Sequence, residues 1–322
     1  MEDSTVKIVI PGGTGQVGTI LTRRFVADGH EFVVLSRHAR PATGNAARVV
    51  NWDARTLSEW VQEIDGSDVV INLAGRSVNC RYHAENRQQI IESRTLSTRV
   101  IGDAIRTSNR PPRVWLQSST ATIYAHRYDL PNDDETGILG GAEENVPETW
   151  RFSVEVAKAW EAAAMEWELP HTRRVLMRSA ITFSPDAGSV FEILLNLVRR
   201  GLGGTNGDGR QYVSWIHDQD FIQAVCWLIE HNDFDGPVNL ASPHPLPNAE
   251  FMRTLRDAWG IPFGLPATKW MLELAAFFMR TESELILKSR RVVPKRLLRS
   301  GFEFQFPKWH EAARDLCDRY RK

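Results

Sequence analysis

Short apolar segments alternate with helical patterns through the first half of the chain. Strands are predicted over residues 7–10, 31–36, 48–52, 68–73, 113–118 and 173–183, and helices over 16–27, 57–64, 84–108 and 147–168. Most of the strand segments are apolar without polar alternation, which is typical of parallel strands covered on both faces. Repeated strand–helix–strand units with right-handed crossovers therefore predict an α/β fold built on a doubly wound parallel sheet.

The pattern changes after residue 183. Helices are predicted over 190–200, 218–231, 248–259, 268–279 and 308–320, with a glycine-rich loop at 201–209 and a strand at 237–241. We expect residues 1–183 to form the main domain, with 212–242 returning to it. Residues 184–211 and 243–322 are expected to form a smaller, mainly helical cap. The apolar stretch 270–279 is interrupted by Glu273 and is too short to span a bilayer.

Three glycines, Gly12, Gly15 and Gly18, follow the first predicted strand at intervals of three residues. Glycines at this spacing allow a sharp turn, close approach to a pyrophosphate and tight packing of helix on strand, as in Rossmann-type dinucleotide sites. The following helix N-terminus offers N–H groups to phosphates, so Thr14, Gln16 and Val17 are included in the predicted cofactor site. A plain tight turn between strand and helix is the alternative.

The end of the second predicted strand bears on the choice of cofactor. NAD-preferring sites place a carboxylate there for the ribose 2′-hydroxyl. Here the chain has Arg37 and Arg40 and no acidic residue, and a guanidinium can bind a 2′-phosphate through charge-assisted hydrogen bonds. The sequence therefore predicts NADP(H), although Arg40 is as well explained as a solvated loop residue.

Two further strand ends reach the same edge of the predicted sheet, where open α/β sheets bind ligands. Leu73 ends one strand, and the small residues Ala74 and Gly75 that follow it leave room for a ring and a ribose. Ser118, Ser119 and Thr120 end the next strand, with hydroxyls expected at the same crevice.

The overall charge is nearly balanced, with 39 Lys and Arg against 40 Asp and Glu. This balance predicts neither nucleic-acid nor membrane binding. Three widely spaced cysteines argue against a disulfide framework, no His or Cys pair has metal-ligand spacing, and the acidic N-terminus is unlike a signal peptide. We expect a cytoplasmic protein without a metal site.

The chain resembles the extended short-chain dehydrogenase/reductases, which include nucleotide-sugar epimerases and dehydratases. More closely, it is similar to the epimerase-like subfamily named after the bacterial YfcH protein, some members of which are labelled cell division inhibitor SulA. The matching segments are 12–18, 72–75, 118–124, 158–161, 178–179, 207–212, 215–217, 293–297 and 301–302.

The resemblance implies roles for individual residues. Thr120 takes the position of the active-site hydroxyl, and Lys158 that of the lysine that holds the nicotinamide ribose. Asp53 is expected to receive the adenine amino group, and Ser118 and Arg178 to belong to the cofactor site.

One catalytic residue of the family pattern is missing. Its tyrosine, one helical turn before the lysine, is replaced by Val154, which cannot transfer a proton. Glu155 could reach Lys158, but an ordinary surface ion pair explains it more simply. On another helix, Ser93 takes the position where the family usually has an asparagine. Tyr124 is the nearest substitute in sequence, but packing is its default role.

A second departure concerns the substrate. The arginine that pairs with a nucleotide-sugar diphosphate is replaced by Val213. Arg210, Gln211, Tyr212 and His217 are the substrate-site candidates. Arg210 is equally well explained as a solvated loop residue, and His217 more simply as a structural hydrogen-bond partner before a helix capped by Asp218.

These features predict an NADP(H)-dependent oxidoreductase or epimerase-like enzyme with a small-molecule substrate that the sequence does not identify. The alternative is an NADPH-binding sensor or partner-binding protein without turnover. The resemblance also makes a homodimer through the helices at 84–108 and 147–168 one possible assembly.

Overall fold

The centre of the protein is a parallel sheet. The computed structural model describes residues 5–38, 48–144, 146–268, 270–271 and 284–322. Within these ranges, seven strands pair in the order β10-β6-β5-β4-β1-β2-β3, all parallel. The strands are Lys7–Pro11 (β1), Glu31–Ser36 (β2), Arg48–Asn51 (β3), Val69–Asn72 (β4), Val114–Thr120 (β5), Arg173–Ser179 (β6) and Gly236–Leu240 (β10). This order has the Rossmann topology, with its switch point between β1 and β4, and confirms the predicted fold class.

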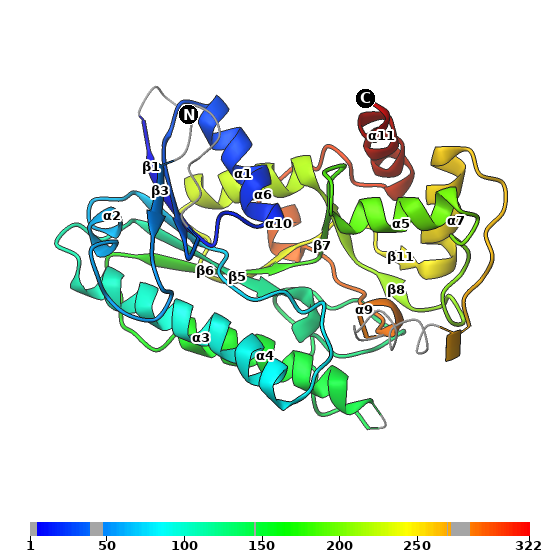
Figure 1. Cartoon of the computed structure of the whole chain (residues 1–322), viewed down its shortest axis with the longest axis horizontal. Coiled ribbons are helices and arrows are strands. Elements are labelled where there is room, and N and C mark those ends of the chain that lie inside the picture. Colours follow the sequence, from blue (N-terminus) through cyan, green and yellow to red (C-terminus); the bar gives the residue numbers. More distant parts are fainter. Residues whose placement is uncertain (1–4, 39–47, 145, 269, 272–283) are drawn as a thin grey trace.

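Helices cover both faces of this sheet (Figure 1). They are Gln16–Ala27 (α1), Val61–Ile64 (α2), Ala84–Thr107 (α3), Glu148–Ala164 (α4) and Asp218–Glu230 (α6). Along β1, Ile8 and Ile10 pack in one core with α1 and α6, while Val9 packs in another with α3. Alternate residues thus enter opposite cores, which explains why the strands are apolar throughout.

A second lobe lies beside the carboxyl edge of the sheet (Figure 1). Its elements are Ile181–Phe183 (β7), Val190–Arg199 (α5), Tyr212–Val213 (β8), Trp215–His217 (β9), Leu246–Pro247 (β11), Asn248–Trp259 (α7) and Trp309–Arg321 (α11). Phe183, Trp215, Phe251 and Trp309 form the centre of its aromatic core.

The structure differs from the predicted elements in three places. The helix expected over 57–64 is reduced to its second half, α2 at Val61–Ile64. The single strand expected over 173–183 is interrupted at Ala180, because β7 pairs with β9 instead of continuing in the main sheet. The short β8 pairs with β11, so within 212–242 the strand that joins the main sheet is β10. Most of the helix expected over 268–279 lies outside the described residues.

The C-terminal region is divided between the two cores. Glu284–Leu287 (α9) and Lys295–Arg299 (α10) precede α11. Leu297 and Phe302, which were expected in the cap, pack with Phe221 in the main core because α10 lies against β10. Helix α11 packs on α7 in the second lobe.

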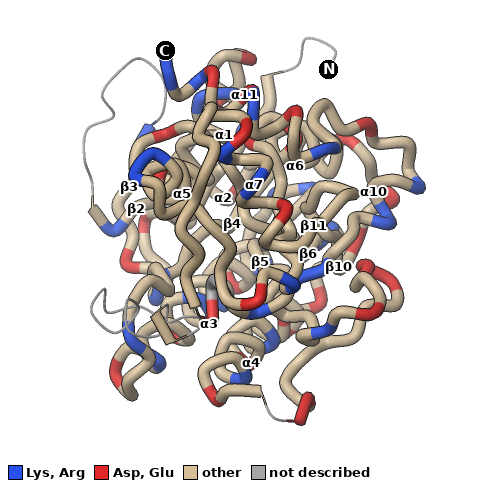
Figure 2. Tube along the Cα trace, turned by 90° about the vertical axis from the view of Figure 1, so that its right-hand side faces the viewer, with Lys and Arg blue, Asp and Glu red and all other residues tan. Residues whose placement is uncertain are grey.

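Charged residues of both signs are interspersed along the trace that Figure 2 shows, without a large area of one sign. Within the described ranges, no helix combines the length and the apolar character needed to cross a membrane.

Candidate functional site: a nucleotide cleft and a second polar cluster

The glycine turn between β1 and α1 is built to a geometry that side chains would obstruct. Gly12 has a φ of +76°, and a Cβ there would lie 2.7 Å from the backbone of Ala74. A Cβ on Gly18 would lie 2.3 Å from the carbonyl oxygen of Gly13. The turn therefore fits directly against the end of β4, at the topological switch point of the sheet.

The N-terminus of α1 is left available to a ligand. Its N-cap is Gly15, which supplies no side-chain cap, and its first turn carries no acidic residue. The orphan N–H groups of a helix N-terminus favour an anion, and the predicted phosphate-binding residues Gln16 and Val17 belong to this turn.

A cleft of about 470 Å³ opens over this turn. It is lined by the ends of β1, β2, β3 and β4 and by one side of α3, and it contains the predicted residues Gly12, Thr14, Gly15, Arg37, Asp53, Leu73, Ala74 and Gly75. Residues from four strand ends thus meet in one concave site, the usual form of a nucleotide site.

The β2 end of the cleft is cationic. Arg37 is exposed and lines the cleft beside Ser36, whose hydroxyl donates to the His38 carbonyl oxygen over 3.1 Å. Arg40 lies outside the described residues.

The β3 end of the cleft carries a fixed carboxylate. Asp53 accepts hydrogen bonds from the backbone N–H groups of Arg55 and Thr56, at 2.8 and 2.9 Å, and from the Thr56 hydroxyl at 2.6 Å. The bonds from Thr56 hold the pKa of Asp53 below its usual value. Asp53 therefore remains an ionised acceptor at the cleft.

The ends of β5 and β6 present a different picture, because the polar groups there contact one another. The Thr120 hydroxyl accepts from the Thr122 N–H at 3.2 Å and caps a short 3-10 turn, Ala121–Ile123 (η1). The Ser119 hydroxyl donates to Glu161 over 2.5 Å. Ser118 is partly buried at the same strand end.

Arg178 and Glu161 form a buried ion pair. Nε and Nη2 of Arg178 both donate to the Glu161 carboxylate over 2.8 Å. Nη1 of Arg178 donates to the Tyr124 hydroxyl over 3.0 Å, and that hydroxyl donates to Asn239 of β10 over 2.9 Å. Burial raises the pKa of Tyr124, although Arg178 opposes the shift. The geometry favours a packing role for Tyr124 over proton transfer. The guanidinium of Arg178, predicted for the cofactor site, is already paired with Glu161 inside the protein.

The loop before α4 covers the position of the missing tyrosine. Val154 is 2% exposed, and a Cβ added to Gly141 would lie 3.4 Å from its side chain. Nζ of Lys158 donates to the carbonyl oxygen of Gly140 over 2.7 Å. The lysine predicted to hold the nicotinamide ribose thus bonds this loop. Ser93 lies elsewhere, accepting from the Arg76 N–H at the cleft.

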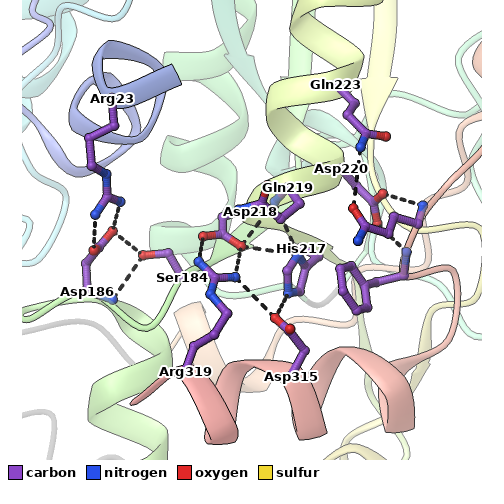
Figure 3. A network of polar contacts seen from close by, with 12 residues as sticks. Arg23, Ser184, Asp186, His217, Asp218, Gln219, Asp220, Gln223, Asp315 and Arg319 are labelled. Carbon is purple, nitrogen blue, oxygen red and sulfur yellow. Dashed lines mark hydrogen bonds and ion pairs between the residues drawn. The ribbon is translucent and has the colours of Figure 1, made fainter. Parts of the chain in front are cut away.

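His217 is part of a polar network between α6 and α11 (Figure 3). It is fully buried; Nδ1 accepts from the Gln219 N–H, and Nε2 lies 2.9 Å from Asp315. His217, not Asp218, is the N-cap of α6, because Asp218 is already helical and binds Arg319. These contacts join the C-terminal helix to the main domain and favour the structural role.

The other substrate candidates do not converge with His217. Arg210 is exposed, with its guanidinium 5.8 Å from the Tyr128 ring. Gln211 is buried and donates to the Asn206 carbonyl oxygen. Tyr212 and Val213 form β8, and Val213 packs against the core of the second lobe. Among the described residues, no cluster of three His, Cys, Asp or Glu side chains has the arrangement of a metal site.

The model of the NAD-dependent epimerase/dehydratase family matches residues 8–241, which span the sheet and the cleft. The chain belongs to this family. A second match, to a domain of unknown function designated DUF1731, covers residues 267–316.

Its relatives in the family extend over nearly the whole chain. The human epimerase family protein SDR39U1 is 29% identical over 97% of this chain and 99% of its own, and YfhF of Bacillus subtilis is 30% identical over 94% of both. A crystal structure of human SDR39U1 with NADPH superposes with a TM-score of 0.83 at 28% identity, covering 97% and 99% of the two chains. A UDP-N-acetylglucosamine 4-epimerase from Methanobrevibacter ruminantium, 15% identical with a TM-score of 0.74, shares the fold.

The sequence reasoning missed a cluster contributed by the DUF1731 region. Nζ of Lys288 donates to the Thr122 carbonyl oxygen over 2.9 Å, and burial lowers the pKa of Lys288 to about 8. Glu284 accepts from Ser153, next to Val154, and Arg290 donates to the Thr122 hydroxyl over 3.2 Å. The C-terminal segment therefore adds further charged groups beside the missing tyrosine. Periodicity along the chain gave no sign of this cluster, since only the fold joins residues 131 to 168 positions apart.

A second missed residue is Arg76, which lines the cleft directly after the predicted run 72–75. The signal that could have identified Arg76 is its position: it is a basic residue directly after a strand end that was predicted to bind a ligand.

Proposed function

We propose that the protein binds NADPH in the cleft at the switch point and acts as an oxidoreductase of the epimerase-like type on a small-molecule substrate. The observation that carries this proposal is a glycine turn at a helix N-terminus facing Arg37, where NAD sites have a carboxylate. NADPH in the crystal structure of human SDR39U1 supports the choice of cofactor. Asp53 lines the same cleft and is the residue proposed to accept the adenine amino group.

The residues also fit the rest of the cofactor. Gln16 Nε2 is buried without a hydrogen-bond partner among the described residues, which is consistent with a ligand at the first turn of α1. When bound, the nicotinamide supplies a hydride donor. Thr120 is the hydroxyl proposed to bind a substrate oxygen, and Lys158 would hold the ribose after exchanging the Gly140 carbonyl for it.

Proton transfer is the unusual part of this proposal. Val154 has no proton to give, and the hydroxyl of Tyr124 is enclosed by Arg178 and Asn239. General acid–base help is worth about a hundred- to ten-thousandfold in rate. Turnover on ordinary nucleotide sugars is therefore expected to be weak or absent, and the loss of a diphosphate-binding arginine at Val213 adds to this expectation.

A second candidate function is an NADPH-binding sensor or partner-binding protein without turnover. The specific observation in its favour is the loop that covers Val154 and accepts a hydrogen bond from Lys158. We also propose that the protein is a member of the YfcH-like subfamily, is located in the cytoplasm and forms a homodimer.

Titration calorimetry with NADPH and NADH tests the cofactor assignment. NADPH is expected to bind more tightly, and Arg37→Ala is expected to weaken NADPH by about 1.5–3 kcal/mol, the range for a hydrogen bond to a charged group, with little effect on NADH. Arg106→Ala removes an exposed arginine at the far end of α3 and serves as the control. Equal affinities of the wild type for the two nucleotides would contradict the assignment.

Oxidation of NADPH in the presence of nucleotide sugars, simple ketones and quinones separates the two candidate functions. Brisk epimerisation of a nucleotide sugar would refute the expectation of weak turnover. If another class reacts, Tyr124→Phe tests the remaining phenol: an unchanged rate supports packing, and a loss of about a hundredfold or more makes it the proton donor. Tight NADPH binding without any reaction favours the sensor.

A further inference from the structure

Two buried side-chain donors near the glycine turn have no hydrogen-bond partner among the described residues. They are Nε2 of Gln16, the first residue of α1, and Nη1 of Arg76, which lines the cleft. Leaving a buried donor unsatisfied costs about 1–3 kcal/mol, and more for a charged group. The donor of Arg76 belongs to a residue of the cleft lining, where a ligand that supplies acceptors would satisfy it.

The backbone of Arg76 is fixed close to the turn. Arg76 lies two residues after Ala74, and the backbone of Ala74 is the part of β4 that a Cβ on Gly12 would meet at 2.7 Å. The N–H of Arg76 donates to Ser93 Oγ of α3 over 3.0 Å. Arg76 and Gly15, the N-cap of α1, both line the cleft.

The turn itself lacks a cation. Residues 11–18 contain no Lys or Arg, so the backbone N–H groups there are neutral donors. A pyrophosphate in the cleft carries negative charge that a guanidinium can bind through bidentate, charge-assisted hydrogen bonds. Arg37 stands at the other end, after β2, where the 2′-phosphate is proposed.

A second arginine strengthens the positive potential at the end of β4. The guanidinium carbon of Arg94 would lie 3.4 Å from a Cβ on Gly75, and it lies 5.0 Å from the Trp160 ring centroid. Burial lowers the pKa of Arg94 to about 10, so the group stays charged at neutral pH. Within the described part of the chain, no carboxylate forms an ion pair with Arg76 or Arg94.

We propose that Arg76 is the cationic partner of the cofactor pyrophosphate. It binds the diphosphate from the β4 side of the cleft, while the N–H groups of the first turn of α1 bind it from the β1 side. This inference rests on the proposed nucleotide site but not on the preference for NADPH, because NADPH and NADH carry the same pyrophosphate.

Titration of the full chain with NADPH, NADH, ADP and AMP tests the proposal. Arg76→Ala is expected to weaken NADPH, NADH and ADP by the same factor, about ten- to a hundredfold, because all three carry a pyrophosphate. AMP, which lacks one, is expected to lose much less. Arg76→Lys should retain part of the affinity, and Arg106→Ala all of it.

Three results would overturn the proposal. A loss confined to NADPH assigns Arg76 to the 2′-phosphate, an equal loss for ADP and AMP assigns it to the adenosine, and unchanged affinities give it a structural role. Thermal unfolding shows whether Arg76→Ala is folded, and Arg76→Gln replaces it if not. A wild type that prefers NADH while Arg76→Ala weakens both nucleotides equally refutes the proposed cofactor choice and leaves the pyrophosphate contact standing.

Discussion

The two halves of the carboxyl edge of the sheet have opposite characters. At the ends of β1 to β4, a cleft of about 470 Å³ contains an uncapped helix N-terminus and the unsatisfied donor of Arg76. At the ends of β5 and β6, the polar side chains satisfy one another: Ser119 and Arg178 bind Glu161, and Tyr124 binds Asn239.

This contrast separates binding from chemistry. Unsatisfied donors around a cavity are costly in a folded protein and are expected where a ligand completes them. A satisfied buried network stabilises the fold and must be disrupted before its members can act on a substrate. The ends of β1 to β4, where the adenosine of the cofactor is proposed to bind (the adenosine half), offer such a donor to the cofactor directly. The ends of β5 and β6, where the nicotinamide is proposed to bind (the nicotinamide half), have to open before they can support a reaction.

The largest expected effect comes from breaking the network in the second half. Glu161→Ala removes the partner of the buried Arg178 guanidinium, and leaving such a charge uncompensated destabilises a fold by about 3–5 kcal/mol. Denaturant unfolding measures this loss. Glu155→Ala, at an exposed position of the same helix, is the control and should change stability little. A normal stability for Glu161→Ala would show that the network is not structural.

A smaller effect on stability but a large one on binding is expected in the first half. Gly12→Ala and Gly29→Ala both place alanine at a φ near +77°, which costs about 1–2 kcal/mol. A Cβ at position 12 also meets the Ala74 backbone, whereas one at position 29 has open space. Gly12→Ala should therefore be the less stable and should lose NADPH affinity. If the two variants have equal stability and equal NADPH affinity, the close approach of Gly12 to the Ala74 backbone does not have the predicted effect.

The smallest effect is expected at Lys158. Since Lys158 must exchange the Gly140 carbonyl for the cofactor ribose, its net gain on binding is small, and Lys158→Met should weaken NADPH by less than about tenfold. Titration calorimetry measures the change, with Lys158→Arg as the variant that keeps the charge. A hundredfold loss of NADPH affinity in Lys158→Met would mean that the nicotinamide half binds the cofactor as strongly as the adenosine half. The two halves of the sheet edge would then not differ in binding.

Most of the sheet could be predicted because local patterns determine it. The strands β1, β2 and β4 are short apolar runs, and the glycine spacing after β1 has a specific geometric purpose that the structure displays at Gly12 and Gly18. The break at Ala180 could not be predicted, because β7 leaves the main sheet to pair with β9, more than 30 residues later. Pairing partners at that distance leave no mark in local periodicity.

The residues of the candidate site could be predicted where they lie at strand ends, but not where their role depends on contacts that are distant in the sequence. The place of Arg37 at the cleft could be predicted from topology, because parallel strands end at one edge, and that of Asp53 from topology together with the family resemblance. The burial of Tyr124 and His217 depends on contacts with Asn239 and Asp315, which lie about a hundred residues away. Neither contact could be inferred from spacing in the sequence.

The most direct test of the contrast is the affinity of a cofactor fragment. Calorimetry compares NADPH with 2′-phospho-ADP, which keeps the adenosine, the 2′-phosphate and the pyrophosphate but lacks the nicotinamide riboside. If the adenosine half supplies nearly all of the binding, the two dissociation constants agree within about tenfold, or about 1.4 kcal/mol. If NADPH binds more than about a hundredfold tighter than the fragment, the nicotinamide half is already a binding site and the central claim is wrong.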